Sequence, residues 1–126
     1  MTRGKSGTRR REPSRAPRSV EGKGAGLLAR LAAPLLERPG VGWGTMMGFP
    51  CLRAGGSFFA SVHHRDQSLI VKLPEARVKQ AVAKGEGQPF APAGRVFKEW
   101  LEVPLARSRS WKKLLAEAHR FVSGQP

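Results

Sequence analysis

The stretch Met46-Met-Gly-Phe-Pro-Cys-Leu-Arg, followed by Gly55-Gly-Ser-Phe-Phe-Ala, decides the fold of this chain. It places a pair of glycines between two runs of strand-forming residues, 49–53 and 58–63. Glycine adopts the positive φ angles that a tight hairpin turn requires, so the two runs are predicted to pair as an antiparallel hairpin. A third strand is expected over residues 68–73, after the polar turn at 64–67.

The segment Val71-Lys-Leu-Pro predicts that the third strand leads directly into a helix over residues 74–84. Pro74 suits the first helical position, and Glu75 complements the positive end of the helix dipole. Val78, Ala81 and Val82 are expected to face inward, and Gly85 to close the helix.

Two further helices are predicted at the ends of the folded region. Residues 25–37 carry a leucine stripe, but Pro34 predicts a kink or an earlier end of that helix. From Ser110 onward the apolar residues recur at helical spacing, with Lys112, Lys113 and Arg120 opposite. Ser108 or Ser110 is the expected N-cap, and Gly124 follows the end. The first stripe holds Leu27, Leu28, Leu31 and Leu35, and the last one Trp111, Leu114, Leu115, Ala118, Phe121 and Val122.

The segments between these elements are predicted from glycine, proline and alternation. Residues 38–44 form a glycine-rich connector, because they lack the strand, helix and lysine that a phosphate loop requires. Residues 87–94 are expected to contain a short edge strand. Residues 95–103 alternate as a strand does, with an irregularity near Phe97 that indicates a bulge or burial on both sides.

The order of elements is therefore α-βββ-α-β(β)-α, an α+β single domain with an antiparallel sheet packed by helices. Together with Pro89-Phe-Ala-Pro-Ala-Gly and Trp100, the quoted motifs resemble the N-terminal domain of the TfoX/Sxy-like family, which looks related to small YjbR-like proteins. The resemblance covers residues 24–122 and rests on pattern and order. It implies the same α+β fold and a regulatory, DNA-linked role. It extends to one domain of the two-domain TfoX-type regulators, so an isolated module is expected.

The chain of 126 residues is basic, with a net charge of +14. Residues 1–23 hold eight cations against two acids and almost no aliphatic side chain, so they are predicted to be a disordered basic tail. Residues 24–126, with fifteen cations against seven acids, form the expected domain. Charge of this kind favours nucleic acid, an anionic membrane or an acidic protein as partner. Solvated surface or genome composition is the alternative explanation.

Enzymatic and metal functions find little support in the residues. The single cysteine, Cys51, has apolar neighbours typical of a structural position. Arg53, two positions along the same strand, keeps a reactive thiol as the alternative. His63 and His64 are adjacent, so on a strand they would point to opposite faces and not chelate together. No nucleophile motif or carboxylate dyad is present. We therefore expect a non-enzymatic protein without cofactor or metal.

Neither a membrane span nor a secretory signal is apparent, so a cytoplasmic location is expected, with an organelle transit peptide as the alternative for the tail. The aromatic residues are expected to lie mostly in the core.

Nucleic-acid binding by phosphate contact is the first functional hypothesis, because no base-reading motif is present. The second is a protein-interaction module that forms a homodimer or docks a partner through a sheet edge or an apolar sheet face. Candidate nucleic-acid contacts lie in the tail and on two helices: Arg9, Arg10, Arg11, Arg15, Arg18, Arg77, Lys79, Lys84, Arg107, Arg109, Lys112 and Lys113.

Overall fold

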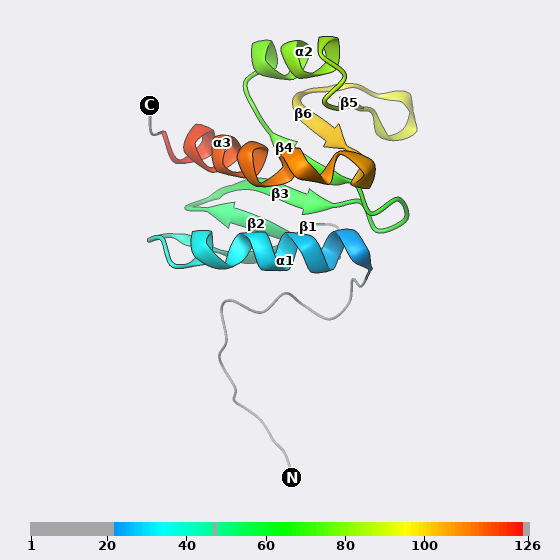
Figure 1. Ribbon diagram of the computed structural model, residues 1–126. Helices are drawn as coiled ribbons and strands as arrows, with labels where there is room; N and C mark the ends of the chain where they lie inside the picture. The colour runs from blue at the N-terminus through cyan, green and yellow to red at the C-terminus, as the bar shows by residue number, and fades with distance from the viewer. Residues whose placement is uncertain (1–21, 47, 125–126) are drawn as a thin grey trace.

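The computed structural model describes residues 22–46 and 48–124, which fold as one α+β domain of three α-helices and a six-stranded antiparallel sheet (Figure 1). The strand order across the sheet is β1-β2-β3-β4-β6-β5. The predicted fold class is confirmed at this level. The helices are α1 (Lys23–Leu36), α2 (Glu75–Ala83) and α3 (Trp111–Ser123). The strands are β1 (Val41–Met46), β2 (Phe49–Ala54), β3 (Ser57–Val62), β4 (Leu69–Lys72), β5 (Gln88–Phe90) and β6 (Phe97–Val103).

Strand β1 occupies most of the segment that was predicted to be a glycine-rich connector, so that prediction is wrong. All six of its residues pair with β2, from Val41 opposite Ala54 to Met46 opposite Phe49. Val41 and Trp43 pack against the core, while Gly42 and Gly44 lie on the other face of the strand. The apolar side chains on one face and the pairing with β2 outweigh the low strand propensity of glycine.

Helix α1 continues to Leu36, through Pro34, which was expected to kink or end it. Proline removes one backbone donor, but only half a turn of helix follows it. Leu35 and Leu36 in that half turn pack against the core, and their burial compensates for the missing hydrogen bond. The helix also begins at Lys23, one residue inside the predicted tail. The rest of the predicted tail, except Gly22, lies outside the described residues.

Two irregularities in strand pairing shape the sheet. The pairing of β5 with β6 shifts between Pro89 and Phe90, which confirms the irregularity predicted near Phe97. A second shift, between Leu52 and Arg53, was not predicted. There the extra residue of β3 is Phe59, so Phe59 and Ala60 are adjacent in sequence and yet both fully buried.

Helices α1 and α3 lie side by side over one face of the sheet (Figure 1), and α2 packs against β5 and β6. The predicted inward residues of α2 and α3 are buried or half-buried as expected. Gly85 and Gly124 end these helices with φ angles of 75° and 74°, also as predicted. Ser110 occupies the N-cap position of α3 but makes no side-chain cap. Its backbone is already helical, because the 3₁₀ segment η2 (Leu105–Ser110) leads directly into α3.

The start of α1 is fixed against the loop between β3 and β4. Gly24 is buried there, and a Cβ at this position would collide with the backbone carbonyl of Gln67. Gly26, two residues later in the same helix, faces open space.

We expect Gly24→Ala to lower the free energy of unfolding by about 1–3 kcal/mol, because backbone must move to admit the methyl group. Gly26→Ala is the matched control and should raise it by up to about 1 kcal/mol, since alanine favours the helix and meets nothing. Urea unfolding followed by circular dichroism measures both. Equal effects of the two substitutions would contradict the close approach at Gly24.

Candidate nucleic-acid interface

The predicted basic contacts separate into three groups in the structure. Arg77, Lys79 and Lys84 belong to α2 and the residue after it, and the second group lies at the junction of η2 and α3. The five arginines of the third group, Arg9, Arg10, Arg11, Arg15 and Arg18, lie outside the described residues.

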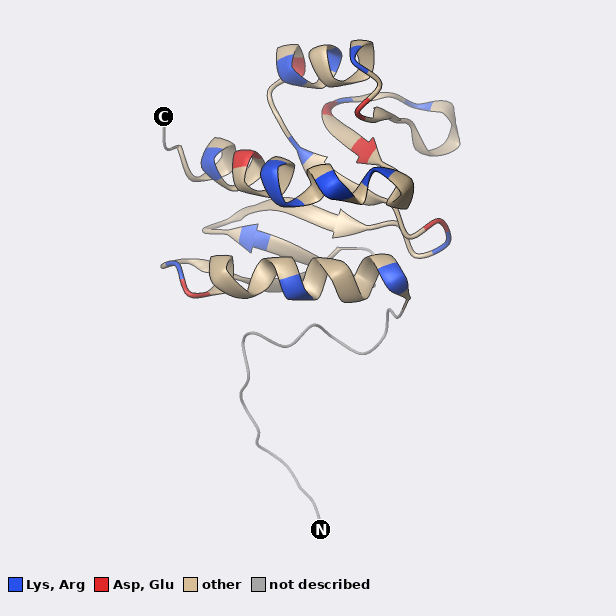
Figure 2. Cartoon of the chain, viewed as in Figure 1, with Lys and Arg blue, Asp and Glu red and all other residues tan. Residues whose placement is uncertain are grey.

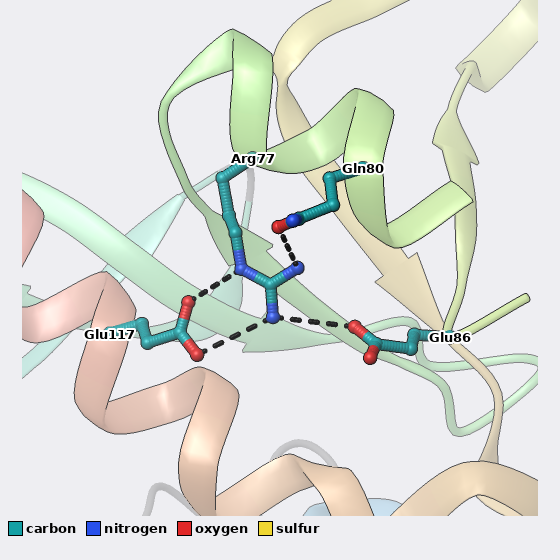
Figure 3. A network of polar contacts seen from close by, with 4 residues as sticks. All are labelled: Arg77, Gln80, Glu86 and Glu117. Atoms are coloured by element: carbon teal, nitrogen blue, oxygen red, sulfur yellow. Dashed lines mark hydrogen bonds and ion pairs between the residues drawn. The ribbon is translucent and has the colours of Figure 1, made fainter. Parts of the chain in front are cut away.

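Arg77 is committed to contacts within the protein (Figure 3). Its Nε donates to Glu117 at 2.8 Å, and its Nη2 lies 3.3 Å from Glu86. Its Nη1 donates to Gln80 at 3.1 Å. The hydrogen bond that Arg77 donates to Glu117 raises the pKa of Arg77 above its ordinary value, so the guanidinium stays charged. Arg77 therefore joins α2 to α3 and has little capacity left for a phosphate.

Lys79 and Lys84, by contrast, are exposed. Lys79 pairs with Glu75 across one turn of α2 at 3.4 Å. An exposed pair of this kind contributes only a few tenths of a kcal/mol and opens easily, so both lysines remain accessible to a ligand.

Among the residues that the structure describes, a dense group of accessible positive charges lies on η2 and α3. Arg107, Arg109, Lys112 and Lys113 are all exposed, and none of the ion pairs within residues 22–46 and 48–124 involves them. The N-terminal end of α3 adds positive potential to the same place. We call the following set the basic helical surface: Arg107, Arg109, Lys112, Lys113 and Arg120.

Figure 2 shows that blue segments also lie on α1, in the same helical layer as α3. They include Lys23 and Arg30, both exposed, which the prediction from sequence did not select. Their spacing of seven residues, two helical turns, places them on the same side of α1. That spacing was the signal available in the sequence.

Cys51 has the structural role that its neighbours indicated. Its side chain is fully buried on β2, and burial raises the pKa of the thiol to about 12. The thiolate, which is the nucleophilic form, is therefore absent at neutral pH.

His63 and His64 do not point to opposite faces, so that expectation is wrong. Their rings stack in parallel with centroids 5.5 Å apart, and the His64 ring also stacks on Phe49 at 4.5 Å. The chain leaves the strand geometry after Val62, and Nδ1 of His63 accepts the backbone N–H groups of Arg65 and Asp66. His63 thus closes the turn. In the described part of the chain, no three His, Cys, Asp or Glu residues gather as a metal site would require.

Most of the aromatic residues are not in the core, contrary to the prediction. Only Phe59 and Trp111 are fully buried, whereas four phenylalanines and Trp100 lie on or beside the sheet face opposite α1 and α3. We call this the open sheet face; its aromatic members are Phe49, Phe58, Phe90, Phe97 and Trp100. A groove of about 310 Å³ crosses it. The imperfect alternation of β6 was the sequence signal for this face, and it was interpreted as a bulge or as burial on both sides.

No helix among the described residues is both long enough and apolar enough to cross a membrane. Comparisons of the chain with models of protein families, with curated proteins and with solved structures find no match.

The contacts of Arg77 predict that its removal destabilises the folded protein and does not weaken phosphate binding. We expect Arg77→Gln to lower the free energy of unfolding by about 1.5–3 kcal/mol, because it leaves Glu117 and Glu86 without their charged donor. Lys79→Gln on the same helix is the matched control and should cost no more than about 0.5 kcal/mol. Urea unfolding measures both. A cost for Arg77→Gln as small as that of the control would show that the network does not hold α2.

His119 predicts a loss of stability in acid. It is buried against Phe59, and burial, with Arg38 and Arg120 nearby, lowers its pKa from the ordinary value of 6.5. The unfolded chain therefore takes up a proton near pH 6.5 while the folded protein does not, so stability is lost as the pH falls below that value.

The expected slope is up to about 1.4 kcal/mol per pH unit, one proton per unfolding event, and His119→Gln should remove it. Urea unfolding between pH 7.5 and about 5 measures the slope, with the exposed His64→Gln as control. An unchanged slope in His119→Gln would assign the acid sensitivity to another group.

Proposed function

We propose that this protein is a non-enzymatic regulatory or adaptor module that binds nucleic acid through phosphate contacts made by the basic helical surface. The observation that carries the proposal is the cluster Arg107, Arg109, Lys112 and Lys113, which is exposed and has no acidic partner in the described structure. Isolated surface cations are common, but four within seven residues at the positive end of a helix form a concentrated field.

The position of the cluster favours an extended anion over a small one. Arg107 lies beside Gly85, at the C-terminal end of α2, while Arg120 is about two and a half turns along α3 from the start of the helix. Lys23 and Arg30 continue the charge onto α1 in the same layer (Figure 2). Nucleic acid presents phosphates at regular spacing over such a distance, and it gains affinity by releasing counterions from each one neutralised.

Binding of this kind is insensitive to sequence. The five lysines and arginines of the basic helical surface can all contact phosphates, and the set includes no aromatic side chain for stacking and no asparagine or glutamine for reading adenine. The eight cations in residues 1–23 add charge to the same chain and strengthen sequence-blind attraction.

The proposed fold assignment is the TfoX N-terminal type, with YjbR-like proteins as relatives. It is supported by the order of a first helix, an antiparallel meander, a second helix, a strand pair and a last helix. That family is associated with DNA-linked regulation, which agrees with the phosphate-binding proposal. A role in partner docking, the alternative, is supported by a different surface and is developed in the next subsection.

The test is the salt dependence of duplex DNA binding by the full chain. We expect the triple variant Arg109→Gln, Lys112→Gln, Lys113→Gln to weaken binding at low salt by at least about tenfold. The slope of log K against log salt should fall by up to about 3, since each phosphate contact contributes about 0.9. Fluorescence anisotropy with two duplexes of unrelated sequence measures the affinity, the slope and the absence of sequence preference.

The matched control removes the same three charges elsewhere: Arg53→Gln, Arg65→Gln, Lys98→Gln, all of them exposed residues away from the basic helical surface. Its affinity should fall much less, because only the long-range charge changes. Equal losses in the two triple variants would mean that net charge alone attracts DNA and that α3 has no special role.

A further inference from the structure

The open sheet face carries a group of large apolar side chains that no helix among the described residues covers. In an antiparallel sheet with one covered face, the other face is normally polar. Here Phe58, Trp100 and Phe97 remain partly exposed on it, and Met46 at the β1 edge is 40% exposed. The glycines of β1 extend the effect, because the ring of Phe58 lies over Gly44, and nothing within 4 Å would meet a side chain at Gly42.

The groove on this face is apolar and carries no cation among its lining residues. It runs between Met46 and Phe49 at one side and Phe90, Phe97 and Trp100 at the other, with Ile70 between them. Its polar groups are Ser61 and the two stacked histidines, and the hydroxyl of Ser61 already donates to the carbonyl of Pro50 at 2.7 Å. A surface of this kind is covered by apolar groups in a stable assembly.

We propose that a second copy of this chain covers the open sheet face, so that the protein is a two-fold symmetric dimer with its two sheets stacked face to face. Sheets pack in this way at about 10 Å when apolar side chains interdigitate between them. In a two-fold interface the same patch serves both partners, so each aromatic side chain of one copy meets the aromatic patch of the other.

The flat area of the sheet is a large part of what each partner buries in a dimer of standard size. At about 4.8 Å between strands and about 3.3 Å per residue, the six strands give a flat footprint of about 500 Å². Side-chain relief and the bordering segment at His64 increase the accessible area towards the roughly 800 Å² per partner of a stable interface.

Charge also selects this face for self-association. The chain carries +14, so two copies repel each other most where cations are dense. Those cations concentrate on the helical layer. The open sheet face carries fewer: Arg53 beside Phe58, Arg95 over the ring of Phe97, and Lys72, which lies 4.0 Å from Glu99 and over the ring of Trp100. Stacking through the open sheet face therefore points the two basic helical surfaces away from each other.

Two other occupants fit the groove less well. Residues 1–23 contain Met1 and Val20 as their only sizeable aliphatic side chains, so the chain's own basic segment cannot fill it. Single-stranded nucleic acid would stack bases on the aromatic rings and needs cations beside them for its phosphates. Of the described cations, only Arg95 over Phe97 and Lys72 over Trp100 lie beside rings that line the groove, Lys72 is shared with Glu99, and the groove lining itself contains no lysine or arginine.

The test is the mass of the full chain in solution, measured by sedimentation equilibrium in 0.5 M salt so that nucleic acid does not bridge the copies. We expect the mass to rise from 13.7 kDa at the lowest concentrations to twice that value. Phe97→Glu and Met46→Glu, from strands on different sides of the groove, should each raise the dimer dissociation constant at least about tenfold. The matched control Val96→Glu changes the adjacent residue, which is 57% exposed and lies outside the groove, and should leave it unchanged.

A mass that stays at 13.7 kDa up to several hundred micromolar would overturn the proposal. So would a dimer that is equally stable in both groove variants, because its contact would then lie elsewhere. Native mass spectrometry of a monomer with a bound apolar molecule, or a single-stranded oligonucleotide whose binding Phe97→Glu abolishes, would assign the face to that occupant instead. The mass is measured in 0.5 M salt, where nucleic acid does not bridge the copies, so the result does not depend on whether the basic helical surface binds duplex DNA.

Discussion

The packing of α3 on strands β3 and β4 is the contact on which the rest of the structure depends. Trp111, Leu114 and Leu115 bury one side of the helix, and their partners in the core include Phe59, Leu69 and Val71, all fully buried. Because that side is fixed, Lys112, Lys113 and Arg120 must face solvent. The hydrophobic pattern of one helix thus sets both the core and the direction of the basic helical surface.

The same helix positions α2 through a polar link. Glu117 of α3 accepts hydrogen bonds from the guanidinium of Arg77 in α2. Glu86, in the segment after α2, accepts another from the same guanidinium. Removing either partner of such a half-buried network leaves a charge without its counterpart, so the cost exceeds that of an exposed pair. This link explains why a basic residue that was a sensible candidate for phosphate binding serves the fold instead.

The elements that the sequence predicted well are those with strong periodicity or a turn residue that fixes φ. Helix α3 follows from its apolar spacing, and the β2–β3 turn follows from Gly55 and Gly56. Strand β1 was missed because glycine, present at Gly42 and Gly44, has a low β propensity. Its pairing with β2, which stabilises the strand, is visible only in the structure. An uncovered apolar sheet face was among the hypotheses from sequence, but its position was not predicted, for a related reason. Alternation indicates that a strand has two sides, but only the packing of α1 and α3 decides which side is covered.

The two candidate surfaces reinforce one another physically. A single basic helical surface with a handful of phosphate contacts gives weak binding that falls steeply with salt. If two copies stack through their open sheet faces, the complex has two basic helical surfaces facing outward on opposite sides of four stacked layers. Two sites on one rigid particle raise the apparent affinity for a long or folded nucleic acid without any new contact. The apolar residues of β1, β4 and β6 would then act on nucleic-acid binding through assembly, although none of them touches a phosphate.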